Sequence, residues 1–178
     1  GPQRRFAKVV NYGLAYGMEA YGLGQRLDIP TEEARGILDS YFAGFPMVKE
    51  FMQRTVVEAK QRGYTTTIFG RRRLITELAS DNFRIRQMGE RMAQNAPVQG
   101  SAADIFKLAM IDVDRALDAA GLRTRMLLTV HDELVFEVPL DEHAAAEPLI
   151  RSTMESVTEL RVPLAVDVGF GPNWAEAK

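Results

Sequence analysis

Two short apolar segments on either side of one polar triplet constrain this chain more than any other feature. Residues 126–130 (MLLTV) and 134–138 (LVFEV) have the length and the side chains of strands, and only His131, Asp132 and Glu133 separate them. His131 and Asp132 tolerate turn geometry, so the pattern predicts a tight hairpin. Its rigid tip would present two adjacent carboxylates and an imidazole, which suits a divalent cation. A solvated acidic turn is the simpler alternative from these residues alone.

The composition allows one sizeable core or two smaller ones. The chain has 178 residues, of which 46% are hydrophobic, and no cysteine, which excludes disulfides and thiolate metal sites. Residues 1–107 carry 16 Lys and Arg against 11 Asp and Glu, a net charge of +5. Residues 108–178 carry 6 against 13, a net charge of −7. The basic first part suggests a polyanionic partner, and the acidic second part could hold cations.

The apolar periodicity and the positions of Gly and Pro predict a mostly helical first part and a mixed second part. Helices are expected at residues 4–27, where four glycines break the helical pattern, and at residues 30–42, 47–62, 80–95, 101–120 and 141–160. Pro97 is expected to end the fourth of these helices, and Ser101 to cap the start of the fifth. Strands are expected at residues 64–69 and 162–170 besides the hairpin. The predicted fold class is therefore α+β.

Cationic and aromatic side chains recur every four residues near the start of the chain. Arg4, Lys8, Tyr12 and Tyr16 share one broad helix face, because each step of four residues advances a helix by about 40° beyond one turn. Cations followed by rings suit an elongated ligand with phosphates at one end and a base or sugar at the other. The alternative is that the two tyrosines belong to the core and the cations are solvated.

Four segments resemble the signature motifs of the family A DNA polymerases, the bacterial DNA polymerase I group. Residues 4–17 are similar to the nucleotide-binding helix of that family, and residues 70–73 (GRRR) to a basic turn. Residues 91–104 resemble a further signature, and residues 130–133 (VHDE) the last catalytic motif. The motifs occur in the family's order. The resemblance implies a mostly helical fingers subdomain at residues 1–80, followed by part of an antiparallel-sheet palm with flanking helices at residues 81–178.

The resemblance also implies catalytic and nucleotide-binding roles. Asp132 would be a ligand of a catalytic pair of Mg²⁺ ions, and Glu133 would support it as a second metal-binding carboxylate. Arg4 and Lys8 would hold the triphosphate of a deoxynucleoside triphosphate, and Lys8 would also help the pyrophosphate to leave. Tyr12 would pack on the sugar and base of that nucleotide.

Primer–template DNA is the second implied partner. Tyr16 would lie at the template position, and His131 would approach the primer end. Contacts near the primer terminus, mainly from the minor-groove side, would come from Arg91, Asn95 and Gln99. The basic turn contains Arg71, Arg72 and Arg73. Three neighbouring cations favour contacts with phosphates over the alternative of a solvated turn. The resemblance implies a place in the bacterial cytoplasm, at the nucleoid, in DNA replication and repair. No apolar run reaches about 20 residues, so we expect no membrane partner.

Two departures from the family pattern change the expected activity. Tyr12 stands where many family members have Phe, and a hydroxyl there relaxes the rejection of nucleotides that lack a 3′-OH. The family's first metal-binding aspartate motif has no counterpart in this chain. Mg²⁺ demands near-ideal octahedral geometry, so we expect the chain by itself to have little polymerase activity.

Two other classes of function fit some of these residues. A non-catalytic nucleotide- or DNA-binding module would use Arg4, Lys8 and Tyr12 together with the basic turn, and its binding would not depend on Mg²⁺. A metal-dependent hydrolase built on residues 131–133 is less favoured, because it needs further ligands and the only other histidine is His143.

Overall fold

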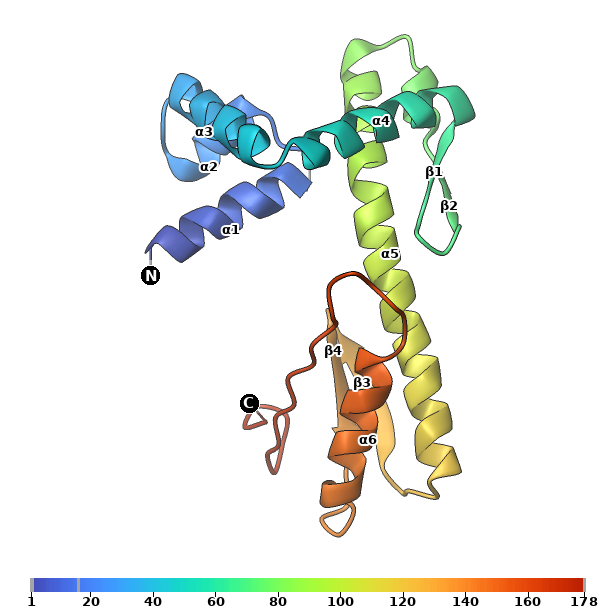
Figure 1. The fold of residues 1–178 in the computed structure, drawn as a ribbon. Helices are drawn as coiled ribbons and strands as arrows, with labels where there is room; N and C mark the ends of the chain where they lie inside the picture. Colours follow the sequence, from blue (N-terminus) through green and yellow to red (C-terminus); the bar gives the residue numbers. More distant parts are fainter. Residues whose placement is uncertain (1, 16, 178) are drawn as a thin grey trace. The chain divides into compact units, whose positions relative to one another are not determined.

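The computed structural model describes residues 2–15 and 17–177, which form two compact units. The first unit extends to Ser101 and the second begins at Ala102, so the division falls inside the long helix α5 (Phe83–Ala119). Two small antiparallel sheets accompany the helices, which confirms the predicted α+β class (Figure 1). The expected subdomain boundary between residues 80 and 81 stays a prediction, since the compact units divide at a different point.

The first unit is mostly helical. Its elements are α1 (Pro2–Ala15), α2 (Ala20–Leu27), α3 (Thr31–Gly44), α4 (Pro46–Arg62), β1 (Tyr64–Thr66), β2 (Arg72–Leu74), the short 3₁₀ helix η1 (Thr76–Ala79) and the first part of α5. The helices predicted at residues 30–42 and 47–62 are confirmed. Pro46 stands at the start of α4, where its missing N–H costs no helical hydrogen bond. Gly63 ends α4 in the left-handed conformation, with φ of +78°.

Two cores hold the first unit together. Val10, Leu14, Leu23 and Ala34 bury the facing sides of α1, α2 and α3. A second cluster joins α4, η1 and α5 through side chains from distant parts of the sequence, namely Ala59, Ile75, Leu78 and Ala93. Small residues on α4 and α5 let these helices approach closely, because an alanine adds little volume between two backbones.

Helix α5 corrects the prediction of two separate helices at residues 80–95 and 101–120. It runs without a break from Phe83 to Ala119 and contains Pro97 in its interior. An interior proline costs a helix roughly 3 kcal/mol. Burial of Ala93 and Ala96 against the rest of the unit offsets that cost. Ser101 is not a helix cap, since its hydroxyl donates back to the Pro97 carbonyl one turn earlier.

The hairpin of β1 and β2 is shorter than the sequence suggests. Tyr64 pairs with Leu74 and Thr66 with Arg72, so the strand predicted at residues 64–69 ends three residues early. The predicted basic turn at residues 70–73 is also corrected, because Arg72 and Arg73 belong to β2. The backbone turns earlier, where the Gly70 N–H donates to the Thr67 carbonyl oxygen.

The second unit contains the rest of α5, β3 (Arg125–Val130), β4 (Glu133–Glu137) and α6 (His143–Glu155). Val130 pairs with Glu133, which confirms a two-residue turn at His131 and Asp132. His131 is in the left-handed region, with φ of +55°. A bulge at Leu127 shifts the register of the two strands. The core of this unit joins α5 to α6 through Val113, Leu117, Ala146 and Ile150.

The end of the chain departs from the predicted pattern. α6 is shorter than residues 141–160, and residues 162–170 form no strand. A strand requires a neighbour to pair with, and among the described residues no strand pairs with this segment. Side chains of α6 hold the segment instead. Arg151 donates to the Val166 carbonyl, Glu155 accepts from the Val166 N–H at 3.0 Å, and the rings of His143 and Phe170 are in contact.

None of the described helices combines the length and the apolar character needed to cross a membrane. The longest of them, α5, contains polar and charged side chains throughout its 37 residues.

A buried carboxylate fastens the start of β3 to the start of α6. Glu142 accepts hydrogen bonds from the backbone and side chain of both Arg123 and Thr124, at 2.8–2.9 Å. Burial acts to raise the pKa of Glu142, but these hydrogen bonds outweigh it and hold the pKa below its ordinary value. The side-chain hydrogen bond to Glu142, together with the nearby Asp141, raises the pKa of Arg123.

We predict that Glu142 makes the stability of the second unit depend on pH. Because its folded-state pKa is lowered, its contribution is present above the unfolded-state pKa and is lost as the pH falls through the folded-state value. Glu142→Gln should therefore lower the melting temperature at neutral pH and have little effect in strong acid. Thermal unfolding of wild type and variant across this pH range measures the difference. Glu147→Gln, which removes a surface carboxylate from the same helix, is the control, and an equal loss there would contradict us.

Candidate functional site

The predicted cationic and aromatic stripe lies on the exposed side of α1. Arg4, Lys8 and Tyr12, called here the α1 face, are exposed, and Tyr12 keeps 53% of its surface accessible. Val10 and Leu14 are buried on the other side of the helix. The Lys8 ammonium lies 5.6 Å from the centre of the Tyr12 ring, in cation–π range. These positions exclude the alternative in which Tyr12 belongs to the core.

The turn after α1 lies directly against α5. Tyr16 falls outside the described residues, so its predicted template contact has no structural counterpart. Gly17, the next residue, has φ of +67°. A Cβ atom at Gly17 would lie 2.6 Å from Oε1 of Gln94 and 3.2 Å from Cγ of Arg91. The end of the α1 segment and the polar side of α5 are therefore in close contact.

Arg91, Asn95 and Gln99, called here the α5 row, occupy successive turns of one helix. Arg91 and Gln99 are exposed and Asn95 is half-buried. Because α5 continues through Pro97, Gln99 lies on the same side of the helix as the other two residues. A helix that ended before Pro97, as predicted, would not place it there. A guanidinium and two amides at this spacing present hydrogen-bond donors and acceptors along one line.

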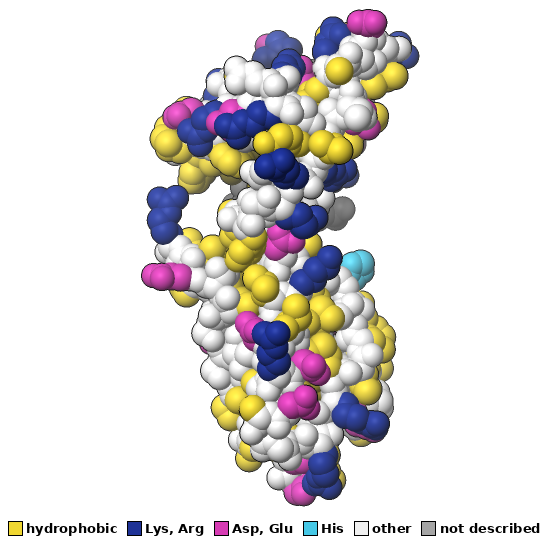
Figure 2. Space-filling view, turned by 90° about the vertical axis from the view of Figure 1, so that its right-hand side faces the viewer, with side chains coloured by type: hydrophobic (Ala, Val, Ile, Leu, Met, Phe, Trp, Pro, Cys, Tyr) yellow, Lys and Arg dark blue, Asp and Glu magenta, His cyan; other side chains and the backbone are white. Residues whose placement is uncertain are grey.

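An open groove of about 570 Å³ lies between the α1–α2 turn, α3, α4 and α5. Its lining includes Arg35, Lys49, Arg91 and Gln94, together with Glu19, whose carboxylate accepts a hydrogen bond of 3.0 Å from Gln87. Charges of both signs line the groove. On the face drawn in Figure 2, Lys and Arg side chains likewise lie among acidic and apolar ones and do not form one continuous basic patch. The groove is therefore shaped for a ligand with separate polar groups and not for a uniform polyanion.

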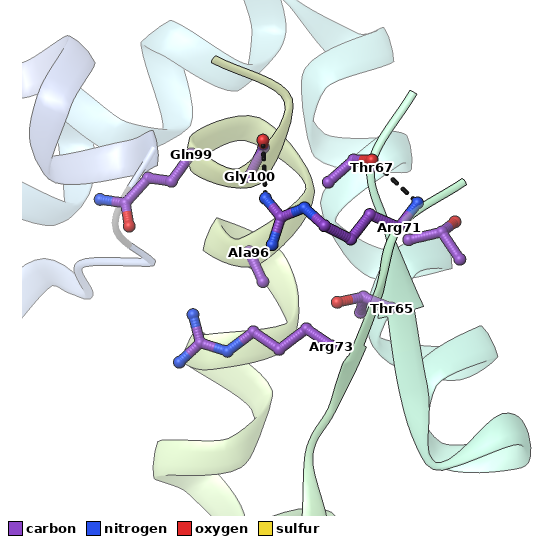
Figure 3. A pocket seen from close by; sticks show the side chains of 8 residues that line it. Thr65, Thr67, Arg71, Arg73, Ala96, Gln99 and Gly100 are labelled. Carbon is purple, nitrogen blue, oxygen red and sulfur yellow. Dashed lines mark hydrogen bonds between the residues drawn. The ribbon is translucent and has the colours of Figure 1, made fainter. Parts of the chain in front are cut away.

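The three arginines of the β1–β2 hairpin have different surroundings. All three are exposed, but Arg72 lies over the Tyr64 ring, 4.8 Å from its centre. Arg71 donates from Nη2 to the Gly100 carbonyl at 3.1 Å. Arg71 and Arg73 line a pocket of about 220 Å³ against α5, together with Thr65 (Figure 3). The three arginines were expected to form a single group of phosphate contacts, but each of them has different neighbours.

The β3–β4 turn presents the predicted polar triplet. His131, Asp132 and Glu133, called here the hairpin tip, are all exposed. Carboxylate oxygens are the ligands that Mg²⁺ prefers, so the donor chemistry of Asp132 and Glu133 fits a hard cation. Among the described residues no group of three or more His, Cys, Asp or Glu side chains could hold a metal ion. These two carboxylates can therefore supply only part of a coordination shell.

The structure brings some of the predicted site residues together. The α1 face, the α5 row and the hairpin arginines all belong to the first unit, and the Gly17 turn joins the first two. The hairpin tip belongs to the second unit. The prediction that the α1 face and the carboxylates of the tip serve one reaction stays a prediction.

Sequence reasoning missed several residues that shape these surfaces. Gln94 and Glu19 line the groove beside Arg91. The one feature of the sequence that could have indicated Gln94 is its spacing of three residues from Arg91, which makes the two side chains neighbours on a helix. Thr67, Gly100 and Ser101 hold the β1–β2 turn against α5. No local pattern marks these contacts, since their partners are about thirty residues apart.

Comparison with known proteins gives consistent matches over almost the whole chain. A model of DNA polymerase family A matches residues 1–176. DNA polymerase I of Mycobacterium bovis is 51% identical over 177 residues, which is 99% of this chain and 20% of that protein. DNA polymerase I of Geobacillus stearothermophilus is 49% identical over 175 residues, 98% of this chain and again 20% of that protein. The chain thus spans about a fifth of the length of these relatives.

A solved structure is similar to this chain as well. It is the POL domain of Pol1 from M. smegmatis, in complex with DNA primer-template and dNTP. The similarity has a TM-score of 0.96 at 50% sequence identity, and it covers 99% of this chain and 31% of that one.

We predict that Gly17 is required for the contact between the α1–α2 turn and α5. Gly17→Ala should lower the free energy of unfolding by about 1–3 kcal/mol, because it combines left-handed strain with crowding against the stem of Arg91, while the Gln94 amide can move aside. Gly36→Ala is the matched control, since Gly36 lies in α3 with open space around it. That change should stabilise the helix by up to about 1 kcal/mol. Urea unfolding measures both, and equal effects would contradict the prediction.

Proposed function

The chain belongs to DNA polymerase family A, and we propose that it is the part of a DNA-directed DNA polymerase that binds the incoming nucleotide and the primer–template DNA. In this proposal the α1 face holds a deoxynucleoside triphosphate. The α5 row, with the hairpin arginines, contacts DNA. A place in the bacterial cytoplasm, at the nucleoid, is part of this proposal, because the relatives are bacterial DNA polymerases.

The exposed α1 face is the observation that carries this proposal. Lys8 and Tyr12 already lie in cation–π range, which favours the arrangement that a ligand would need and reduces the conformational entropy lost on binding. Arg4 and Lys8 neutralise triphosphate oxygens by charge-assisted hydrogen bonds. Tyr12 offers its ring to the sugar and base, and Lys8 stays beside the phosphates to neutralise the departing pyrophosphate.

The α5 row supports contact with DNA near the primer terminus. Arg91 binds the backbone or a base edge, while Asn95 and Gln99 offer amides that both donate and accept. Minor-groove acceptors occur in every base pair, so donors there detect the geometry of a correct pair without reading its sequence. Arg72 and Arg73 add phosphate contacts, and His131 approaches the primer end.

The hairpin tip supplies the metal-binding carboxylates of the proposed reaction. Asp132 and Glu133 fit a hard cation, although they form only part of its shell. Divalent ions, when bound, stabilise the attacking and leaving oxygens of an in-line phosphoryl transfer. We expect the 178-residue chain by itself to extend a primer far more slowly than a complete polymerase, because this partial shell binds Mg²⁺ weakly.

A non-catalytic binding module is the second candidate function. The mixed charge of the groove beside Arg91 favours it, since such a groove can hold a nucleotide without any metal ion. The two proposals differ in one property. If the hairpin tip is part of a metal site, Mg²⁺ strengthens nucleotide binding and Asp132 is required for this effect. A non-catalytic module binds the nucleotide equally well without Mg²⁺.

We predict that Arg4 is required for nucleotide binding. Calorimetric titration with a deoxynucleoside triphosphate should give roughly 10- to 150-fold weaker binding to Arg4→Ala, since a hydrogen bond to a charged group contributes about 1.5–3 kcal/mol. Arg26→Ala removes an equally exposed cation from α2 and is the matched control. Equal affinities of the two variants would exclude the α1 face as the triphosphate site.

We also predict that Asp132 carries the effect of Mg²⁺ on this binding. In the same titration, Mg²⁺ should strengthen nucleotide binding to the wild type and leave Asp132→Ala unaffected. Asp167→Ala serves as the control, because it removes an acidic side chain remote in sequence from the tip. Binding that is independent of Mg²⁺ in the wild type would favour the module.

The hydroxyl of Tyr12 sets a further expectation. In a complete polymerase that contains this chain, Tyr12→Phe should strengthen the rejection of dideoxynucleotides, measured as the ratio of kcat/KM for the deoxy and dideoxy substrates. An unchanged ratio would show that the hydroxyl does not control this selection.

A further inference from the structure

The turn of the β1–β2 hairpin is fastened to α5 immediately after Pro97. The Ile68 N–H donates to Oγ of Ser101 at 3.0 Å, and Arg71 donates from Nη2 to the Gly100 carbonyl at 3.1 Å (Figure 3). The Ser101 hydroxyl in turn donates to the Pro97 carbonyl. These residues, Ile68, Arg71, Pro97, Gly100 and Ser101, are called here the hairpin–helix contact.

The turn is also held by hydrogen bonds of its own. Thr67 accepts the Arg71 N–H at its side-chain oxygen at 3.1 Å and donates its own N–H to the Arg71 carbonyl at 3.0 Å. These bonds fix the backbone of Arg71, so its side chain leaves the turn in a set direction. The direction matches the Gly100 carbonyl, as Figure 3 shows.

The contact leaves no room between the turn and the helix. A Cβ atom at Gly100 would lie 2.7 Å from Cγ2 of Thr67 and 3.4 Å from Nη2 of Arg71. Glycine is a poor helix former, and its presence inside α5 is explained by this close approach. The absence of a side chain at Gly100 is thus a requirement of the contact.

Pro97 weakens α5 at the same place. It has no N–H, so the helical hydrogen bond to the Ala93 carbonyl is missing. Gln99 lies between this interruption and Gly100. The direction of its side chain therefore depends on how well the turn holds the helix after Pro97.

We propose that the β1–β2 turn positions Gln99 of the α5 row, and that Arg71 acts as a positioning residue through Gly100 and not as a direct DNA contact. The inference rests on the proposed function of the α5 row in DNA binding. It reassigns Arg71 alone among the three arginines. What Arg71 contributes is a directed N–H donor, whereas a phosphate contact would contribute mainly charge.

Gly100→Ala tests the proposal without changing any charge. The added methyl group should push the turn from the helix and weaken binding to a fluorescent primer–template duplex about tenfold in an anisotropy titration, although alanine favours the helix itself. Gly36→Ala, which meets no neighbour, should bind as the wild type does. Wild-type affinity in a folded Gly100→Ala would overturn the proposal.

A double-mutant cycle with Arg71→Ala and Gln99→Ala is the second test, and Arg71→Ala introduces no steric conflict. If Arg71 acts through Gln99, the double variant should bind DNA within twofold of the weaker single variant. For Arg71→Ala, the slope of log affinity against log salt concentration should match the slope for the surface control Arg54→Ala. Multiplicative losses, or a slope reduced by about one in Arg71→Ala alone, would identify a phosphate contact and overturn the proposal.

Arg91→Ala separates failure of this inference from failure of the proposed function. Weakened DNA binding in Arg91→Ala beside unchanged binding in Gly100→Ala and Arg71→Ala would overturn the positioning role and leave the function standing. Unchanged binding in both Arg91→Ala and Gln99→Ala would overturn the function of the α5 row and the inference with it. Faster hydrogen exchange at the amides of residues 98–101 in Arg71→Ala is expected if the turn holds this part of the helix.

Discussion

The continuation of α5 through Pro97 is the constraint on which much of this structure depends. A helix interrupted there would end the α5 row after Asn95 and leave Gln99 in a loop. Burial of Ala93 and Ala96 holds the segment before and at the proline, and the hairpin–helix contact holds the segment after it. The geometry of the row is therefore a property of the surrounding unit more than of the helix alone.

Local signals in the sequence were sufficient to predict elements whose ends are set by residues at those ends. Pro46 and Gly63 mark the two ends of α4, and His131 and Asp132 form the predicted two-residue turn. Periodicity was sufficient to place Arg4, Lys8 and Tyr12 on the exposed side of α1. In each of these cases, the residues that decide the structure are neighbours along the chain.

The failures share the opposite cause. Pro97 reads as a helix end because its cost is local, while the burial that offsets it comes from α4 and η1. Residues 162–170 have the composition of a strand, yet composition cannot supply a pairing partner. The contacts of Gly17 with Gln94 and of Arg71 with Gly100 join residues too far apart for any spacing rule. These contacts hold the surfaces that carry the candidate residues, so the sequence predicted which side chains are exposed better than how they are held.

The bulge in β3 has a consequence for the behaviour of this chain in concentrated solution. Leu127 and Leu128 keep 55% and 44% of their surfaces accessible, and among the described residues β3 and β4 pair only with each other. A flat apolar ribbon with unpaired outer edges is a template for stacking with further copies. The extra residue at Leu127 bends the ribbon and increases its twist, so that a second ribbon cannot stay in step along its edge. An irregularity of one residue thereby disfavours edge-to-edge pairing of this hairpin with further copies.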